Sequence, residues 1–272
     1  MKQKPNVVAG VLTPLWLLFT LIPVYVVVIG SIATAQSFRK GGPLSWPEDL
    51  TAGNYGNIIT GEFPLYMATT MGIALMTVGL NLLLSLPATY AVVRGKSQAT
   101  RRVFRIILLG LAIPSQTVLI PLFWIIRSLG LYDSVWAIVL PQAAFGIPMT
   151  VLIVSSGMRS IVNELYDAMI VDGATVTQRF LRLALPLSKS PIATVSIFHF
   201  LGAWNSFLFP LIFTHSKEMT VMTVGLYKFI GAYDVDYPSL FAAVLLSAFP
   251  LLLMYIFARR WLLAGLMGMS GR

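Results

Sequence analysis

The side chains able to do chemistry in this chain are few, and those inside its apolar runs are uncharged. There are ten acidic residues, two histidines and no cysteine. No acidic residue falls firmly in the middle of an apolar run, which argues against a proton or sodium relay built on buried carboxylates. Without cysteine there is no disulfide or thiolate metal site, and two histidines are too few for a histidine-rich metal centre. The G-x-x-x-x-G-K-[ST] pattern is also absent, so ATP hydrolysis by that chemistry is not expected.

Amide, imidazole and hydroxyl groups within the apolar runs are the remaining candidates for function. An uncharged, hydroxyl-rich solute would need such groups together with an aromatic face. His199, Trp204, Asn205 and Ser206 offer them within about two helical turns. Because the same groups commonly hydrogen-bond one membrane helix to another, helix packing stays open as the alternative. The wider set of polar residues at membrane depth is Asn81, Gln116, Gln142, His199 and Asn205.

The elements that must position these groups are apolar helices. Hydrophobic residues make up 57% of the chain and charged residues 11%, with a mean hydropathy of +0.81. This composition is typical of an all-α polytopic membrane protein. The first apolar run is too long for a cleaved signal peptide, so we expect an uncleaved helix. Six runs of about 20 residues or more predict six transmembrane helices in one domain over 1–272: 8–33, 66–93, 106–129, 135–156, 192–213 and 240–258.

Basic residues predict the orientation of these helices. Of the 19 Lys and Arg residues, 14 fall on the side that carries both termini and five on the other. The positive-inside rule therefore places both termini in the cytoplasm. The net charge of +9 sits in short loops at membrane ends, where anionic lipid headgroups explain it better than nucleic acid does.

A polar, charged segment on the cytoplasmic side, within a loop at about 157–190, has the pattern of a short helix. Asn163 is suited to cap its start, and Glu164 and Asp167 favour the positive end of a helix. Gly173 supplies the permissive backbone that ends it. The segment therefore predicts a short helix followed by a sharp turn.

A second helix is predicted to follow the turn. Thr175 and Gln178 have the spacing of a capping box, which would start this helix. It would run to Leu185, where Pro186 would end it. On the first helix, Leu165, Met169 and Ile170 share one side and form an apolar ridge. The ridge would either rest in the headgroup layer or dock into a cytoplasmic partner.

These residues resemble the EAA loop of binding-protein-dependent ABC transporter permeases. The carbohydrate branch fits best, specifically permeases similar to the maltose-type second permease. The resemblance begins with Leu165–Ala174, Phe180 and Leu185–Pro186. It covers nearly the whole chain, with further matches in order at Ala88–Arg94, Ile113–Pro114, Ile120–Phe123, Leu129–Leu131, Leu140–Pro141, Gly146–Pro148, Ala203–Phe207, Pro210–Leu211 and Ala264–Gly268.

Three departures from the family pattern stand out. The Glu-Ala-Ala core reads Asp167-Ala168-Met169, which keeps the acid and the first small residue but places a larger side chain third. The usual Asn-Ser before the second span is Thr69-Thr70, and an Asp often found after Trp-Asn is Ser206. The first departure leaves docking plausible and puts the usual choice of partner in doubt.

The resemblance implies a subunit of an ATP-driven importer with the type I ABC importer permease fold in a bacterial or archaeal cytoplasmic membrane. A second permease, two cytoplasmic ATPases that bind ATP and Mg²⁺, and an external solute-binding protein delivering a sugar or oligosaccharide would be its partners. The chain itself would be a transport subunit without enzymatic activity, cofactor or metal. The implied ATPase-coupling residues are Glu164, Asp167, Ala168, Met169, Asp172 and Gly173. The implied solute contacts are Phe145, Gly146 and Met149, together with His199, Trp204, Asn205 and Ser206.

The sequence lacks the residues that other membrane functions would require. A stand-alone secondary transporter would need an intramembrane carboxylate, and a membrane transferase would need acids or histidines clustered near the interface. An ABC importer of another solute, such as glycerol phosphate, is a closer competitor. A phosphorylated solute would require buried Arg or Lys in the path, and only Arg127, near the outer end of the third span, comes close.

Overall fold

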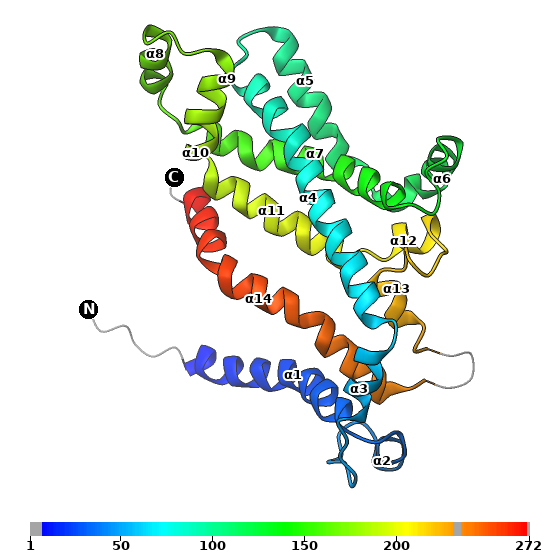
Figure 1. The fold of residues 1–272 in the computed structure, drawn as a ribbon. Helices are drawn as coiled ribbons and strands as arrows, with labels where there is room; N and C mark the ends of the chain where they lie inside the picture. Colours follow the sequence, from blue (N-terminus) through cyan, green and yellow to red (C-terminus); the bar gives the residue numbers. More distant parts are fainter. Residues whose placement is uncertain (1–6, 231–234, 271–272) are drawn as a thin grey trace. The chain divides into compact units, whose positions relative to one another are not determined.

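Apolar helices long enough to cross a bilayer form the frame of the structure (Figure 1). The structure is a computed structural model that describes residues 7–230 and 235–270. Within them, four helical stretches qualify as spans: Leu12–Ser31 in α1 (Val7–Ser31), α4 (Phe63–Arg94), α7 (Val135–Arg159) and Tyr237–Ile256 in α14 (Tyr237–Ser270). The described part of the chain contains no named strand. The all-α prediction is therefore confirmed.

The predicted third span is bent. It consists of α5 (Gln98–Leu109), two 3₁₀ turns (Gly110–Ala112 and Ser115–Val118) and α6 (Leu119–Ser128). Its two halves meet at 90°. The bend falls at Ile113 and Pro114, where the backbone is extended because a residue before proline avoids the helical conformation and proline has no N–H to donate.

The predicted fifth span is interrupted. It comprises α11 (Lys189–Trp204) and the short α12 (Leu208–Phe213), which are separated at residues 205–207. The described residues thus hold four helices that pass a length and hydropathy test for spanning, or five if the bent pair counts as one. The exact count of six stays a prediction.

Contacts divide the chain into two units. The first ends at Met67 and resumes over Val224–Leu252, and the second holds Ala68–Thr223 and Leu253–Arg272. In the first unit, the segment between the first two predicted spans folds into α2 (Ala35–Gly41) and α3 (Gly53–Thr60). The Asn54 side-chain amide donates to the carbonyls of Ser31 and Ala33, each at 2.9 Å, which ties α3 to the end of α1. The first unit also contains α13 (Met222–Tyr227) from Val224 onward. The single-domain prediction stays a prediction.

Helix α7 is the centre of the second unit and packs against α5, α11 and α12. Small residues allow these close approaches. A Cβ added to Gly157 would lie 2.5 Å from Cγ of Pro191 on the neighbouring segment, and one added to Gly110 would lie 2.8 Å from Cγ of Pro148. Both glycines are therefore required by helix packing.

A single carboxylate holds together the loops at one end of the second unit. Asp133 adopts a positive φ of 57° in the turn between α6 and α7. Its Oδ1 accepts hydrogen bonds from the backbone amides of His215 and Ser216, at 2.9 and 3.0 Å, and from the Ser216 hydroxyl at 3.1 Å. The His215 imidazole lies 3.4 Å from Oδ2. Burial alone would raise the pKa of Asp133, but these hydrogen bonds and the neighbouring His215 hold it below 3.8.

This carboxylate should make the stability of the second unit depend on pH. Because the native pKa of Asp133 is depressed, its contribution is present above the ordinary value of 3.8 and is lost as the pH falls through the lower native pKa. Asp133→Asn keeps an acceptor and tolerates the positive φ, so it should lose only the charge. Melting temperatures in detergent should show a wild-type advantage over Asp133→Asn at neutral pH that shrinks on acidification. An advantage that grew at low pH would contradict this assignment.

Candidate functional site

The first predicted cytoplasmic helix exists as α8 (Asn163–Val171), although Asn163 does not cap it. The N-cap position is Val162, which makes no side-chain capping bond. Asn163 Oδ1 instead accepts a 2.8 Å hydrogen bond from Arg94 at the end of α4. The predicted cap is therefore wrong, because a charged donor 69 residues away takes the oxygen that would have capped the helix.

The end of α8 follows the prediction. Gly173 has a φ of +75°, a left-handed conformation that favours glycine. The Ala174 amide donates to the Met169 carbonyl at 2.8 Å, and the Gly173 amide donates to the Ile170 carbonyl at 3.0 Å. These two bonds are the paired contacts of a Schellman motif. The direction in which the chain leaves α8 is thus set by local hydrogen bonds.

The second predicted helix begins as expected but continues past its predicted end. Thr175 and Gln178 form the reciprocal capping box at the start of α9 (Val176–Arg179). A π-helical turn (Phe180–Ala184) follows, then α10 (Leu185–Leu187). The Leu185 amide donates to the Phe180 carbonyl five residues earlier, as in a π-helix. Pro186 lies in the first turn of α10, where no backbone N–H is required. Pro186 therefore does not end the helical segment, which corrects the prediction.

Tyr166 anchors α8 to the end of α4 and to the π-helical turn. Its side chain is fully buried beside Tyr90, and the Phe180 ring packs against Tyr90 in a tilted arrangement. The Arg94 guanidinium lies 3.9 Å from the centre of the Tyr166 ring, within cation–π distance. Burial raises the pKa of the Tyr166 hydroxyl, and the charge of Arg94 lowers it in part. One arginine therefore holds α8 through both Asn163 and Tyr166.

Apolar side chains of α8 other than Tyr166 are exposed. Leu165 is 44% exposed, Ile170 50% and Val171 87%. Met169, which lies between Leu165 and Ile170 on the predicted ridge, is half-buried, and Val171 points to another side of the helix than Leu165. All the other predicted coupling residues are exposed: Glu164, Asp167, Ala168, Asp172 and Gly173. Figure 1 shows α8 at the same end of the second unit as α9 and the start of α5.

Among the predicted solute contacts, His199 is buried in a hydrogen-bonded network. The Asn81 amide donates to the Ala143 carbonyl at 2.9 Å, which turns Asn81 Oδ1 toward Thr150. The Thr150 hydroxyl donates to that oxygen at 2.6 Å and lies 2.7 Å from His199 Nε2. The single hydroxyl proton of Thr150 is then donated to Asn81. His199 Nε2 must therefore donate its own proton to the Thr150 oxygen, and His199 Nδ1 is left as an acceptor. The network joins α4, α7 and α11.

Gly146 lies against this network. A Cβ at Gly146 would come 2.6 Å from the Asn81 amide nitrogen and 2.8 Å from His199 Cε1. The structure thus brings Gly146 and His199 together, as the predicted path requires. It also adds Asn81 and Thr150. Asn81 was visible in the sequence as a polar residue at membrane depth, whereas nothing in the sequence distinguished Thr150 from other threonines.

The other predicted solute contacts differ in their surroundings. Phe145 and Met149 are half-buried, and Phe145 stacks on Phe209 with ring centres 6.1 Å apart. Trp204 is buried and stacks on Phe200. Asn205 is exposed and donates to the Leu201 carbonyl of its own helix, and the Ser206 carbonyl accepts from the Thr223 hydroxyl at 2.6 Å. These residues are not gathered around one cavity of the described structure, and their contact with a solute stays a prediction.

Comparison with known proteins decides the family. The sequence profile described as "Binding-protein-dependent transport system inner membrane component" matches residues 81–264, which include the network of Asn81, Thr150 and His199 and all of α8. The chain belongs to this family. It is therefore a membrane permease subunit of an ABC importer and a transport component rather than an enzyme.

Named relatives of this permease cover most of its length. It is 30% identical to a diacetylchitobiose uptake system permease protein of Streptomyces coelicolor, over 90% of this chain and 82% of the relative. It is 29% identical to a trehalose transport system permease protein of Mycobacterium tuberculosis, over 91% of both chains. A bacterial ABC transporter involved in the import of the acidic polysaccharide alginate shares the fold, with a TM-score of 0.83, 22% identity and coverage of 94% and 95%. The predicted importer permease fold is confirmed.

Removing the central hydroxyl of the network should destabilise the permease. Thr150→Val keeps the side-chain shape but leaves Asn81 Oδ1 and His199 Nε2 without their shared partner, at a cost of about 1 to 2 kcal/mol. Thr194→Val is the matched control, because that hydroxyl bonds only to the Ser190 carbonyl of its own helix. Thermal unfolding in detergent should separate the two variants. Equal melting temperatures would show that the network contributes no stability.

The anchor of α8 should depend on the Tyr166 ring and not on its hydroxyl, which is buried with no hydrogen-bond partner among the described residues. Tyr166→Phe should therefore preserve stability or raise it slightly. Tyr166→Ala removes the ring beneath Arg94 and should cost about 3 to 5 kcal/mol. Melting curves, and the rate of proteolysis within 163–186, measure both effects. A loss in Tyr166→Phe equal to that in Tyr166→Ala would contradict the assignment.

Proposed function

We propose that this permease forms half of a membrane path for a sugar or oligosaccharide that an extracytoplasmic solute-binding protein delivers. Named relatives supply the solute class, because permeases of diacetylchitobiose, trehalose and arabinooligosaccharide systems all align over most of this chain. In the second unit, Asn81 and His199 supply neutral hydrogen-bonding side chains beside Gly146. Such groups suit a solute rich in hydroxyls. We place Phe145, Gly146, Met149, His199, Trp204, Asn205 and Ser206 along the path.

The second part of the proposal is that α8 couples this path to a cytoplasmic ATPase. The observation that carries it is the exposure of Leu165 and Ile170, on the predicted ridge of a helix anchored through Tyr166 and Arg94. A ridge of this kind would gain free energy by docking into an apolar groove. Because the helix is anchored to α4 at one end and capped by Gly173 at the other, movement of the docked partner would be transmitted to the membrane helices.

Partners and orientation complete the proposal. A second permease would supply the other half of the path, and two ATPases would bind ATP and Mg²⁺. Both termini would lie in the cytoplasm, because the basic residues concentrate on that side. Glu164, Asp167, Ala168, Met169, Asp172 and Gly173 would form or support the surface that meets the ATPase.

A charge on the ridge tests the coupling. Ile170→Asp places a carboxylate where an apolar groove should close, and should weaken ATPase association by about tenfold or more. Leu129→Asp is the control, since Leu129 is an exposed leucine that follows α6, outside the 163–186 segment. Each variant is expressed with its transport operon, and the ATPase retained on the tagged permease is quantified beside uptake of labelled di- and oligosaccharides.

Wild type and Leu129→Asp should retain the ATPase and import at least one of these sugars, whereas Ile170→Asp should lose both. Normal ATPase retention by Ile170→Asp would reject α8 as the coupling element. Wild-type transport of none of the sugars, with ATPase retention intact, would reject the solute class and leave the coupling proposal standing.

A further inference from the structure

A pocket lined with arginines lies between α5 and the end of α7. Its volume is about 480 Å³, and it belongs entirely to the second unit. Arg101, Arg102 and Arg105 come from α5, and Arg159 is the last residue of α7. The chain passes from Arg159 to α8 within four residues, so the pocket lies at the α8 end of this unit. Gln98, Phe104 and Val92 complete the lining.

The positive charge of this pocket is not neutralised within the described structure. None of its four guanidinium groups pairs with a carboxylate in residues 7–230 and 235–270. Arg101, Arg102, Arg105 and Arg159 are also exposed. Four like charges this close repel one another unless an anion lies among them.

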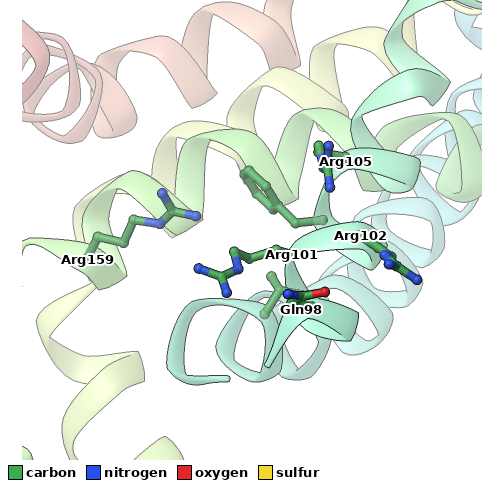
Figure 2. Close-up of a pocket in the computed structure, with 7 residues that line it drawn as sticks. Gln98, Arg101, Arg102, Arg105 and Arg159 are labelled. Carbon is green, nitrogen blue, oxygen red and sulfur yellow. The ribbon is translucent and has the colours of Figure 1, made fainter. Parts of the chain in front are cut away.

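One arginine is held in position by an aromatic ring of the pocket. The Arg159 guanidinium lies 5.0 Å from the centre of the Phe104 ring, which fixes it by a cation–π contact. Figure 2 shows Arg101 and Arg159 extending from different helices toward the same space, while Arg102 points away from Arg159. Two planar guanidinium groups that converge in this way match the oxygen atoms of a phosphate, which arginine binds in a bidentate manner.

Exposed apolar side chains lie on the same helix as three of the arginines. Ile106, one turn after Arg102, is 66% exposed, and Val103 is 48% exposed. In a membrane protein, exposed valine and isoleucine at this position are suited to contact acyl chains. A ligand with a phosphate for the arginines and hydrocarbon for Val103 and Ile106 would satisfy both surfaces.

We propose that this pocket binds the phosphate of an anionic phospholipid headgroup, whose acyl chains lie along Val103 and Ile106. The headgroup holds α5 against the end of α7, which precedes α8 by a few residues. The site is independent of the solute path and of the ATPase-docking ridge, and it stands whichever solute is carried.

The test measures lipid binding to the purified, full-length permease. Delipidated protein in detergent is titrated with phosphatidylglycerol, phosphatidylcholine or inorganic phosphate, and the melting temperature and the lipid retained in native mass spectra are recorded. The double variant Arg101→Gln with Arg159→Gln removes the two converging arginines. The control, Lys96→Gln with Arg182→Gln, removes the same charge from exposed positions outside the pocket.

Wild type and control should be stabilised by phosphatidylglycerol and not by phosphatidylcholine. Each arginine near an anionic headgroup is worth about fivefold in affinity, so the double variant should bind about 30-fold more weakly. Arg101→Gln alone should bind about fivefold more weakly, which keeps the test decisive if the double variant unfolds. If the control bound phosphatidylglycerol as weakly as the double variant, the effect would come from general surface charge, and the proposed site would be wrong.

Stabilisation by inorganic phosphate, with no response to phosphatidylglycerol, would assign the pocket to a soluble phosphate and overturn the lipid proposal. Stabilisation by neither would overturn the site itself. Stabilisation by phosphatidylglycerol that the double variant loses and the control keeps would establish it.

Discussion

A polar group buried among membrane helices has no water to bond with, and this constraint governs the second unit of the permease. Asn81, Thr150 and His199 come from three helices, and the Thr150 hydroxyl links Asn81 Oδ1 to His199 Nε2 while the Asn81 amide bonds to the Ala143 carbonyl. Gly146 permits the three to meet, since a Cβ there would overlap Asn81 and His199. The same residues therefore hold the helices together and supply the neutral groups that we assign to the sugar path. In the path that we propose, packing and solute recognition would draw on one set of side chains.

Helix α8 shows how a short element becomes a rigid connection. Isolated helices of nine residues are marginal in water, so α8 needs support from outside itself. Arg94 supplies it, through a hydrogen bond to Asn163 and a cation–π contact with Tyr166. Gly173 and the capping box at Thr175 then set the path of the chain into the next helix. Tyr166 is committed to the permease, whereas Leu165 and Ile170 stay exposed.

The arginine pocket gathers four of the basic residues that the sequence predicts on the cytoplasmic side of the membrane. The positive-inside rule treats such residues as a sum of charges. In the structure, Arg101 and Arg159 converge on one space beside an aromatic ring, and α5 also carries exposed aliphatic side chains. A phospholipid bound there would be held by geometry as well as charge, next to the segment that leads to α8. Lipid composition would then influence the helix to which we assign coupling.

The sequence by itself determined the features that rest on neighbouring residues. The apolar runs predicted an all-α membrane protein, and Gly173 and the Thr175–Gln178 capping box were correct because their hydrogen bonds span only a few residues. The order of motifs along the chain indicated the permease family. Only the tertiary structure decided that Arg94 takes the Asn163 side chain, that Thr150 links Asn81 to His199, and that Arg159 meets Arg101. These contacts join residues about 50 to 70 positions apart. Such pairs depend on how helices pack in three dimensions, which no local pattern specifies.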